Sequence, residues 1–480
     1  MDASKLARLR EAVRSSRSPG PGQASGARVP APGSSEGSAP HPGSLGRTLG
    51  GVWLNERTLV VEREYPTSAR HGGRTIAEYA AAAERHAGAL ELLSRVAARA
   101  DSSRQQWLDL PGEPRGHSRL VFFDLETTGL SGGAGTCAFL VGCGYFDGGA
   151  FHTHQFFLPS YPTERALLET VGEFMDEADA IITFNGRAFD LPLIEMRYLF
   201  HRMTCPLTKL PHLDLLLPAR RLWRRRDDGP EAAAERPRRW PDGRASAPGL
   251  LAAERSSCAL TALEAAILRV VRHSDVPGFE IPGRYFQYVR SGDPRPLVAV
   301  LEHNRLDLLS LAALTSVVAR LVEEGPQAAG TARECFALGR LYDQVGDGER
   351  ATACYRRAGG LEGEGDAIAA ADAAVRVDAL QVLARRMRSE RRHAEAVEAW
   401  DRIVTQAGGN PWAEREAAEA LAIHHEHRSG NLDGARMFAL RALAAEPDPV
   451  RQEAVRHRLA RLDRKIAARQ REASLDEPSS

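Results

Sequence analysis

Residues 120–130 read LVFFDLETTGL, and this stretch decides the expected fold. An apolar run leads directly into an acidic pair and then a turn, which is typical of a buried strand. Side chains at i and i+2 of a strand share one face, so Asp124 and Glu126 are expected to project together. Adjacent carboxylates repel each other unless protons or cations intervene. The pair is therefore either a strand end that meets solvent or part of a site for a hard divalent cation.

The elements that follow predict an α/β fold with a mixed sheet. Two apolar runs flank the turn signal Asp147-Gly148-Gly149 and are typical of a hairpin. Helical and strand-like segments then alternate. The expected elements are strands at 137–146 and 151–158, a helix from Thr163, a strand at 180–184, a helix at 191–200 and a strand at 212–216. Three antiparallel strands are thus expected before parallel strands with helices.

Composition divides the rest of the chain. Residues 1–46 become rich in Ser, Gly, Pro and Ala and are expected to be disordered. Residues 47–325 are expected to form the α/β domain, whose N-terminal extension has one or two short strands near 52–60 and a helix at 75–98. The Arg- and Pro-rich part at about 224–256 indicates a flexible insertion. Further helices are expected at 260–271 and 296–323.

Residues 330–464 are expected to be entirely helical. Three Ala-rich segments of similar character recur, and two of them follow a Gly turn. The segments are 351–358, 394–400 and 435–442. They resemble tetratricopeptide helix-turn-helix repeats, although their spacing of about 40 to 45 residues exceeds the usual 34 or so. Residues 465–480 are expected to form a polar tail.

Charge, cysteine usage and hydropathy limit the class of protein. The 480 residues include 63 basic and 63 acidic side chains, so any attraction to nucleic acid must be local. The six cysteines include no Cys-x-x-Cys pair, which argues against a zinc ribbon or a disulfide framework and favours a cytoplasmic protein. No apolar run reaches 18 residues and the N-terminus lacks a signal-peptide core, so no membrane association is expected.

Two later segments add acidic residues to the first pair. Asn185-Gly186 ends a predicted strand and Asp190 opens the next helix, at the edge of the sheet where sites collect. Asp190 alone is also what a helix N-cap would look like. On a late helix, His303 and Asp307 are four residues apart and share a face. A solvated helix face is the alternative for that pair.

In this order the segments resemble the DEDD exonucleases. The chain from about residue 48 to 321 is similar to the bacterial YprB-type ribonuclease H-like family, a branch of the DnaQ-like exonucleases. The segments that carry the resemblance are FDLETTGLSGGAGT at 123–136, FNGRAFD at 184–190, HLDL at 212–215 and HNRLD at 303–307. The resemblance implies a ribonuclease H-like mixed sheet followed by the helical repeat domain.

The resemblance also implies two-metal hydrolysis of phosphodiester bonds, with two Mg²⁺ or Mn²⁺ ions. Asp124 would bridge the ions, Glu126 and Asp307 would complete one site, and Asp190 would support the other. His303 would be the general base. DEDD enzymes place His five residues, or Tyr four residues, before the last Asp. This chain has His at the Tyr spacing, which leaves the role of His303 open. Asp214, a fifth acid, is kept outside the ligand set.

Two groups of residues are candidates for contact with nucleic acid. Asn185 and the backbone of Gly132 and Gly133 are placed to meet a phosphate or ribose, or they simply form turns at strand ends. An arginine cluster that includes Arg224 surrounds Trp223, so the arginines would hold phosphates while the indole stacks on a base. A solvated loop is the alternative, because acidic residues follow at once.

The sequence therefore predicts a metal-dependent 3′–5′ exonuclease that acts on single-stranded DNA or RNA. The helical repeats would bind a protein partner. The alternative is an adaptor, whose ribonuclease H-like part binds nucleic acid with little or no turnover while its repeats recruit other proteins. The presence of all four carboxylates favours the enzyme.

Overall fold

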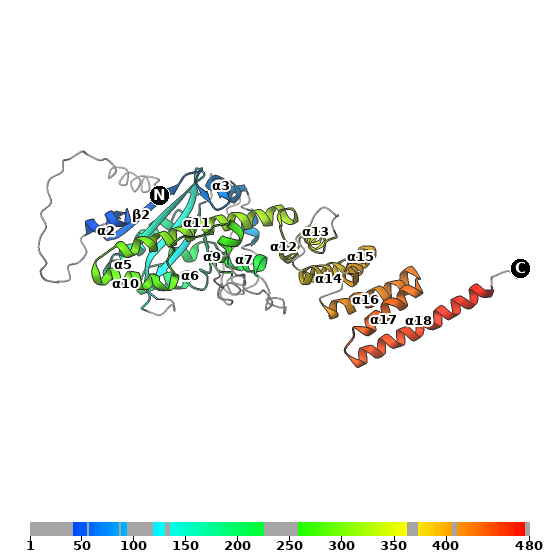
Figure 1. Ribbon diagram of the computed structural model, residues 1–480. Helices are drawn as coiled ribbons and strands as arrows, with labels where there is room; N and C mark the ends of the chain where they lie inside the picture. Colours follow the sequence, from blue (N-terminus) through cyan, green and yellow to red (C-terminus); the bar gives the residue numbers. More distant parts are fainter. Residues whose placement is uncertain are drawn as a thin grey trace, which may run out of the picture. The chain divides into compact units, whose positions relative to one another are not determined.

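A computed structural model describes residues 42–54, 57–85, 88–93, 119–129, 135–224, 258–361, 373–405 and 410–475 (Figure 1). The chain divides into two compact units. The first unit combines 1–85, 102–217 and 259–317, and the second combines 86–101, 218–258 and 318–480. Residues 1–41 and 225–257 hold nearly all of the expected disordered segment and insertion, and they lie outside the described residues.

The first unit is built on a seven-stranded sheet with the strand order β1-β2-β7-β6-β5-β8-β9. Neighbouring strands from β1 to β5 pair antiparallel, whereas β5, β8 and β9 pair parallel. The strands are β1 (Val52–Leu54), β2 (Thr58–Tyr65), β5 (Leu120–Thr127), β6 (Ala138–Asp147), β7 (Ala150–Phe157), β8 (Ala180–Thr183) and β9 (His212–Asp214). This topology confirms the predicted ribonuclease H-like mixed sheet.

Helices in the first unit follow the expected order with one break. They are α3 (Ile76–Arg85), α5 (Glu164–Met175), α6 (Asp190–Phe200), α9 (Leu260–Leu263), α10 (Ile281–Ser291) and α11 (Arg295–Glu324), the last of which continues into the second unit. Helix α7 (Leu216–Trp223) starts in the first unit, and from residue 218 on it belongs to the second. A single helix was expected at 260–271. Instead, a π-helical turn at 264–268 follows α9 and ends at Arg269, whose left-handed backbone (φ 60°) stops the helix.

The N-terminal extension is more ordered than its composition indicates. Strand β2 has eight residues rather than the few expected, because it pairs along its length with β7. A small hairpin of β3 (Arg70–His71) and β4 (Arg74–Thr75) precedes α3. Helix α2 (Pro42–Leu49) begins inside the segment that was expected to be disordered, because Leu45 and Leu49 are buried in the core of the sheet.

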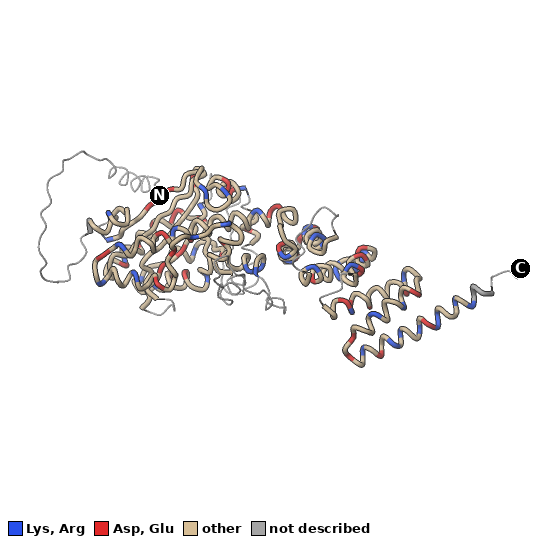
Figure 2. The backbone as a smooth tube through the Cα atoms, in the orientation of Figure 1, with Lys and Arg blue, Asp and Glu red and all other residues tan. Residues whose placement is uncertain are grey.

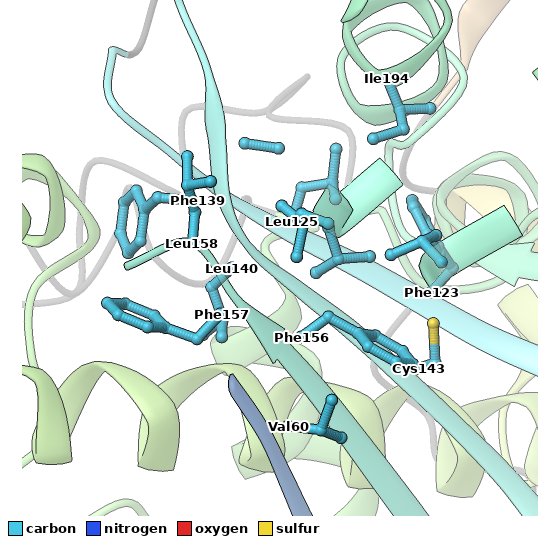
Figure 3. Packing of buried hydrophobic residues seen from close by; sticks show 14 of the residues in the cluster. Val60, Phe123, Leu125, Phe139, Leu140, Cys143, Phe156, Phe157, Leu158 and Ile194 are labelled. Atoms are coloured by element: carbon cyan, nitrogen blue, oxygen red, sulfur yellow. The ribbon is translucent and has the colours of Figure 1, made fainter. Parts of the chain in front are cut away.

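Alternation along β5 separates the core from the acidic residues. Val121, Phe123 and Leu125 are buried in the large hydrophobic cluster. Figure 3 shows Phe123 and Leu125 packed among side chains from other strands, with Ile194 of α6 nearby. Because strand side chains alternate, Asp124 and Glu126 point to the opposite face. The core thus fixes which face of β5 carries the carboxylates.

The second unit is helical and consists largely of antiparallel pairs. Its helices after α11 are α12 (Ala332–Val345), α13 (Gly348–Ala358), α14 (Ala373–Ser389), α15 (His393–Thr405), α16 (Pro411–His424), α17 (Leu432–Ala444) and α18 (Pro449–Leu475). The three recurrent segments fall in α13, α15 and α17, each packed on the helix before it. This confirms an all-helical region of paired helices, and its assignment to the tetratricopeptide class stays a prediction.

Charged residues of both signs are interspersed along these helices (Figure 2). Helix α18 continues to Leu475, well into the segment expected to be a polar tail. None of the helices in the described residues is long and apolar enough to cross a membrane. All six cysteines lie in described residues and none is paired in a disulfide.

Candidate active site

The first two carboxylates stand on the central strand of the sheet. Asp124 pairs in register with Gly142 of β6, and Glu126 pairs with Leu140. An irregularity in the β5–β6 pairing follows Glu126, where the strand ends. Glu126 is only 9% exposed and Asp124 is half-buried. The pair is therefore not a strand end that meets solvent.

Asp190 follows β8 and Asp214 ends β9, the two parallel strands that succeed one another on one side of β5. Because β5, β8 and β9 are parallel, the chain segments that leave them lie at one edge of the sheet. Asp190 is the first residue of α6, and no side-chain cap bond is made at that helix start. Asp214 ends β9, and its carboxylate accepts hydrogen bonds from the backbone N–H groups of Asn185 (2.8 Å) and Leu216 (3.0 Å). Asp214 thus shapes the loop before Asp190.

Helix α11 brings His303 and Asp307 to the unit that holds the other carboxylates. Their side chains are 14% and 18% exposed, so they do not form a solvated helix face. The His303 Nε2 atom is 3.6 Å from Asp307 Oδ2, and its Nδ1 atom is 2.8 Å from Asp275 Oδ1. Asp275 was not singled out in the sequence, because it lies in an irregular segment 28 residues before His303.

Asn304 joins α11 to β5 and was also missed. Its side-chain amide donates to Asp124 Oδ2 at 2.7 Å, and its carbonyl oxygen accepts from Gln155 Nε2 at 2.9 Å. The side chain is fully buried. It fits because Gly142 has no side chain, since a Cβ there would lie 2.3 Å from Asn304 Oδ1. The position of Asn304 between His303 and Asp307 was the only signal in the sequence.

Electrostatics show that the four predicted ligands act on one another. Burial, followed by the charges of Asp307 and Asp190, raises the pKa of Asp124 well above its usual range. Burial, followed by the charges of Asp124, Asp307 and Asp190, raises the pKa of Glu126 well above its usual range. Burial and the charges of Asp214 and Asp307 raise the pKa of Asp190 to about 7. Carboxylates in this situation gain most from a nearby cation.

A buried arginine already supplies one positive charge. Arg272 donates to Glu264, to Asp275 (Nη1 to Oδ2, 3.0 Å) and to Asp307. Its side chain is 6% exposed. Burial opposes the charged form, but the bonds to Glu264 and the charge of Asp307 outweigh it and raise the pKa of Arg272. No sequence pattern pointed to Arg272, because only the turn at Arg269 brings it back to the site.

The donor chemistry fits divalent cations, although the side chains are not arranged as a finished site. Four carboxylates outnumber the single positive charge of Arg272. Carboxylate oxygens are the ligands that Mg²⁺ and Mn²⁺ prefer. In the described part of the chain, no group of three His, Cys, Asp or Glu side chains is placed to hold a metal ion. Asp307 is engaged with Arg272 and Asp124 with Asn304. Asp124, Glu126, Asp190 and Asp307 would hold the ions.

The loop after β8 has a strained backbone next to Asp190. Asn185 is left-handed (φ 66°), a conformation that few residues other than glycine adopt. Gly186 follows because a Cβ there would lie 2.5 Å from the Thr183 side chain. Such strain is characteristic of binding loops. Gly132 and Gly133, the other predicted backbone contacts, lie outside the described residues.

Trp223 and Arg224 belong to the second unit, whereas the carboxylates belong to the first. The indole Nε1 of Trp223 donates to Glu334 Oε1 at 2.8 Å, and the carbonyl of Arg224 accepts from Arg333 at 3.1 Å. Trp223 is half-buried and Arg224 is exposed. The structure therefore ties this segment to α12, and its contact with nucleic acid stays a prediction.

Comparison with known proteins agrees with this arrangement. The model of the RNase H superfamily matches residues 121–319, which include all four carboxylates and His303. The chain is similar to the uncharacterized protein YprB of Bacillus subtilis (strain 168), with 28% identity over 424 residues. The match covers 87% of this chain and 88% of that protein. Residues 121–319 are therefore similar to the RNase H superfamily, in a chain that resembles YprB over most of its length.

Proposed function

We propose that this protein is a metal-dependent 3′–5′ exonuclease that hydrolyses single-stranded DNA or RNA. The observation that carries the proposal is the group of Asp124, Glu126, Asp190 and Asp307. They come from a central strand, a neighbouring helix start and a late helix. Burial, together with the charges of nearby carboxylates that include Asp307, raises the pKa of each of the first three. Membership of residues 121–319 in the RNase H superfamily supports phosphodiester hydrolysis.

Two Mg²⁺ or Mn²⁺ ions held by these carboxylates would supply the activation of water and the stabilisation of the leaving oxygen. Asp124 is fixed for this role because Asn304 holds one of its oxygens. Asp275 orients His303, since the hydrogen bond at Nδ1 leaves Nε2 available as the acceptor of a proton. The His303 Nε2 atom lies 3.6 Å from Asp307 Oδ2, which supports a role as the general base despite the unusual spacing.

Other residues would position the substrate. The backbone of Asn185 presents a strained turn near Asp190, and Gly132 and Gly133, which follow β5 in the sequence, would contact a phosphate or ribose. In the second unit, Arg224 would hold a phosphate and Trp223 would stack on a base. The paired helices of that unit would bind a protein partner through repeats of the tetratricopeptide type.

One observation favours the adaptor alternative. Arg272 donates to Asp307, one of the four carboxylates, and no three-donor group is assembled in the residues that the structure describes. A ribonuclease H-like domain in this state would bind an end of nucleic acid and turn it over slowly or not at all. The helical unit would then recruit other proteins.

The test uses 5′-labelled single-stranded DNA and RNA with the full-length chain in Mn²⁺ or Mg²⁺. We expect products that shorten stepwise from the 3′ end, and we expect Asp124→Asn to slow the reaction by roughly 100-fold or more. Glu169→Gln, a change at an exposed carboxylate of α5, serves as the matched control and should keep wild-type activity.

Two outcomes would contradict the enzyme. Equal degradation by wild type and Asp124→Asn would mean that a contaminant acts. A wild type that binds the labelled strand but leaves it intact in both metals would favour the adaptor.

A further inference from the structure

Each of the three guanidinium nitrogens of Arg272 donates at least one hydrogen bond to a carboxylate. Nε is 2.8 Å from Glu264 Oε2, Nη1 is 3.0 Å from Asp275 Oδ2, and Nη2 donates to both Glu264 and Asp307. The side chain is 6% exposed and Glu264 is 1% exposed. A bidentate arginine–carboxylate pair of this kind is rigid.

The local fold holds this guanidinium in place. Glu264 opens the π-helical turn, and the left-handed Arg269 reverses the chain so that Val270 N–H donates to the Glu264 carbonyl at 3.0 Å. Gly73 N–H donates to the carbonyl of Leu268 at 3.1 Å, which ties the turn to the β3–β4 hairpin. Arg272 is therefore a fixed charge and not a mobile side chain.

The four carboxylates differ in how their charge is balanced. In Asp307, one oxygen accepts from Arg272 and the other faces His303 at 3.6 Å. Asp124 has the neutral amide of Asn304 as its donor. Within the described residues no arginine or lysine forms an ion pair with Asp124, Glu126 or Asp190. In the part of the chain that the structure describes, Asp307 is thus the member of this group that forms an ion pair with an arginine, whereas Arg272 acts on Asp124 through its charge alone.

We propose that Arg272 is a built-in counter-ion for Asp307, so that a divalent ion that needs Asp307 must compete with the guanidinium. An ion that relies on Asp124 and Asp190 binds first and tightly, and the ion that relies on Asp307 together with Glu126 binds second and weakly. This inference rests on the proposed metal-dependent function. It assigns Arg272 as a positioning residue that sets the order and strength of metal binding.

The test measures binding of Mn²⁺ to the full-length chain by electron paramagnetic resonance of the free ion, without nucleic acid. Wild type should bind one ion tightly and a second at least about tenfold more weakly. The double variant Arg272→Gln/Glu264→Gln removes the guanidinium together with the buried charge it would leave unpaired. Its second ion should bind about tenfold or more tightly than in wild type, because a repelling positive charge is gone.

Matched variants separate charge from side-chain loss. Arg272→Lys keeps the positive charge and should keep the weak second ion. Arg284→Gln removes an arginine whose partner, Glu280, is exposed on the same unit and should leave both affinities unchanged.

Either of two results would overturn the role of Arg272, one with wild type and one with the folded double variant. Two ions of equal affinity in wild type would show that Arg272 exerts no competition. A folded double variant whose second ion stays as weak as in wild type would show the same. If wild type binds no Mn²⁺ and degrades no nucleic acid, the proposed function fails with it, whereas active wild type with unchanged affinities overturns only the role of Arg272.

Discussion

Asn304 shows how a single side chain links two distant parts of the site. It lies 180 residues from Asp124 in the sequence, yet its amide nitrogen is 2.7 Å from the Asp124 carboxylate. Gln155 holds the other side of the amide. A buried amide with a partner on each side resists rotation, because turning it would leave polar atoms without hydrogen bonds. Asn304 therefore orients Asp124 while keeping α11 close to the sheet.

Gly142 is the residue that admits this amide, so a methyl group there should damage the site. We expect Gly142→Ala to lower the free energy of unfolding by about 1 to 3 kcal/mol, because overpacking forces Asn304 away from Asp124. The proposed exonuclease activity should fall by more than the loss of folded protein accounts for, because Asp124 loses the hydrogen bond from Asn304. Urea unfolding and the end-labelled assay measure the two effects.

Gly283→Ala is the control for this substitution. Gly283 lies in α10 and has open space where a Cβ would stand, so alanine should be neutral or slightly stabilising. Gly142→Ala with wild-type stability and activity would show that the fit against Asn304 is loose.

At the scale of elements, the β3–β4 hairpin is docked on α11 through a neutral histidine. The His71 ring Nε2 lies 2.8 Å from Ser310 Oγ, and the residue is 7% exposed. Burial, together with the charge of Arg272, lowers the pKa of His71 from 6.5 to about 4. The hairpin that carries His71 also donates a hydrogen bond, from Gly73 N–H to the Leu268 carbonyl of the π-helical turn, so it links α11 to the segment that positions Arg272.

Stability should therefore depend on pH through His71. The unfolded chain takes up a proton near pH 6.5 and the folded chain only near pH 4. The contribution is fully present above pH 6.5 and is lost as pH falls towards 4, by up to about 3 kcal/mol. In His71→Gln, the free energy of unfolding should therefore decrease less than in wild type when the pH is lowered from 6.5 to 4. Urea unfolding at a series of pH values measures this difference.

Some of that fall will remain in the variant, because burial also lowers the pKa of His212 to about 4. His273→Gln, at an exposed position of the same unit, should keep the wild-type dependence on pH. If His71→Gln also keeps the wild-type dependence of stability on pH, the hairpin is not held by a neutral histidine.

At the scale of the whole molecule, each compact unit has its own packing. The first is organised by the hydrophobic cluster on the sheet, and the second by close helix pairs. Gly339 of α12 illustrates the second kind, because a Cβ there would lie 2.6 Å from the Tyr355 ring. The Tyr355 hydroxyl donates to Asp343 at 2.6 Å, so that ring has little freedom to move.

We expect calorimetry to resolve two unfolding transitions, one for each unit. Gly339→Ala should lower the transition of the helical unit by several degrees and leave exonuclease activity unchanged, because its damage is confined to the α12–α13 pair. Gly142→Ala should lower the other transition. Gly330→Ala, where the neighbouring side chain lies at ordinary contact distance, serves as the control. A single transition that either damaging variant lowers equally would contradict independent units.

Local patterns determined the class of fold and the four predicted ligands. Alternation in 120–130 separates Phe123 and Leu125 from Asp124 and Glu126, and this depends only on the period of a strand. The order of hairpins, helices and parallel strands followed from similar patterns. The helix pairs of the second unit were predictable because each carries its own apolar spacing and turn residues. The break at Arg269 and the length of β2 were not, since both depend on partners distant in sequence.

Only the tertiary structure decided what surrounds the carboxylates. Asn304, Asp275, Arg272 and Glu264 have no mutual spacing that a pattern could detect, and they meet because α11 and the π-helical turn fold against the sheet. Acidic residues at the ends of elements are visible in a sequence, because each obeys the geometry of its own strand or helix. The counter-charges and orienting amides are not visible, because a charge or hydrogen-bond partner is chosen by distance in space and not by distance along the chain.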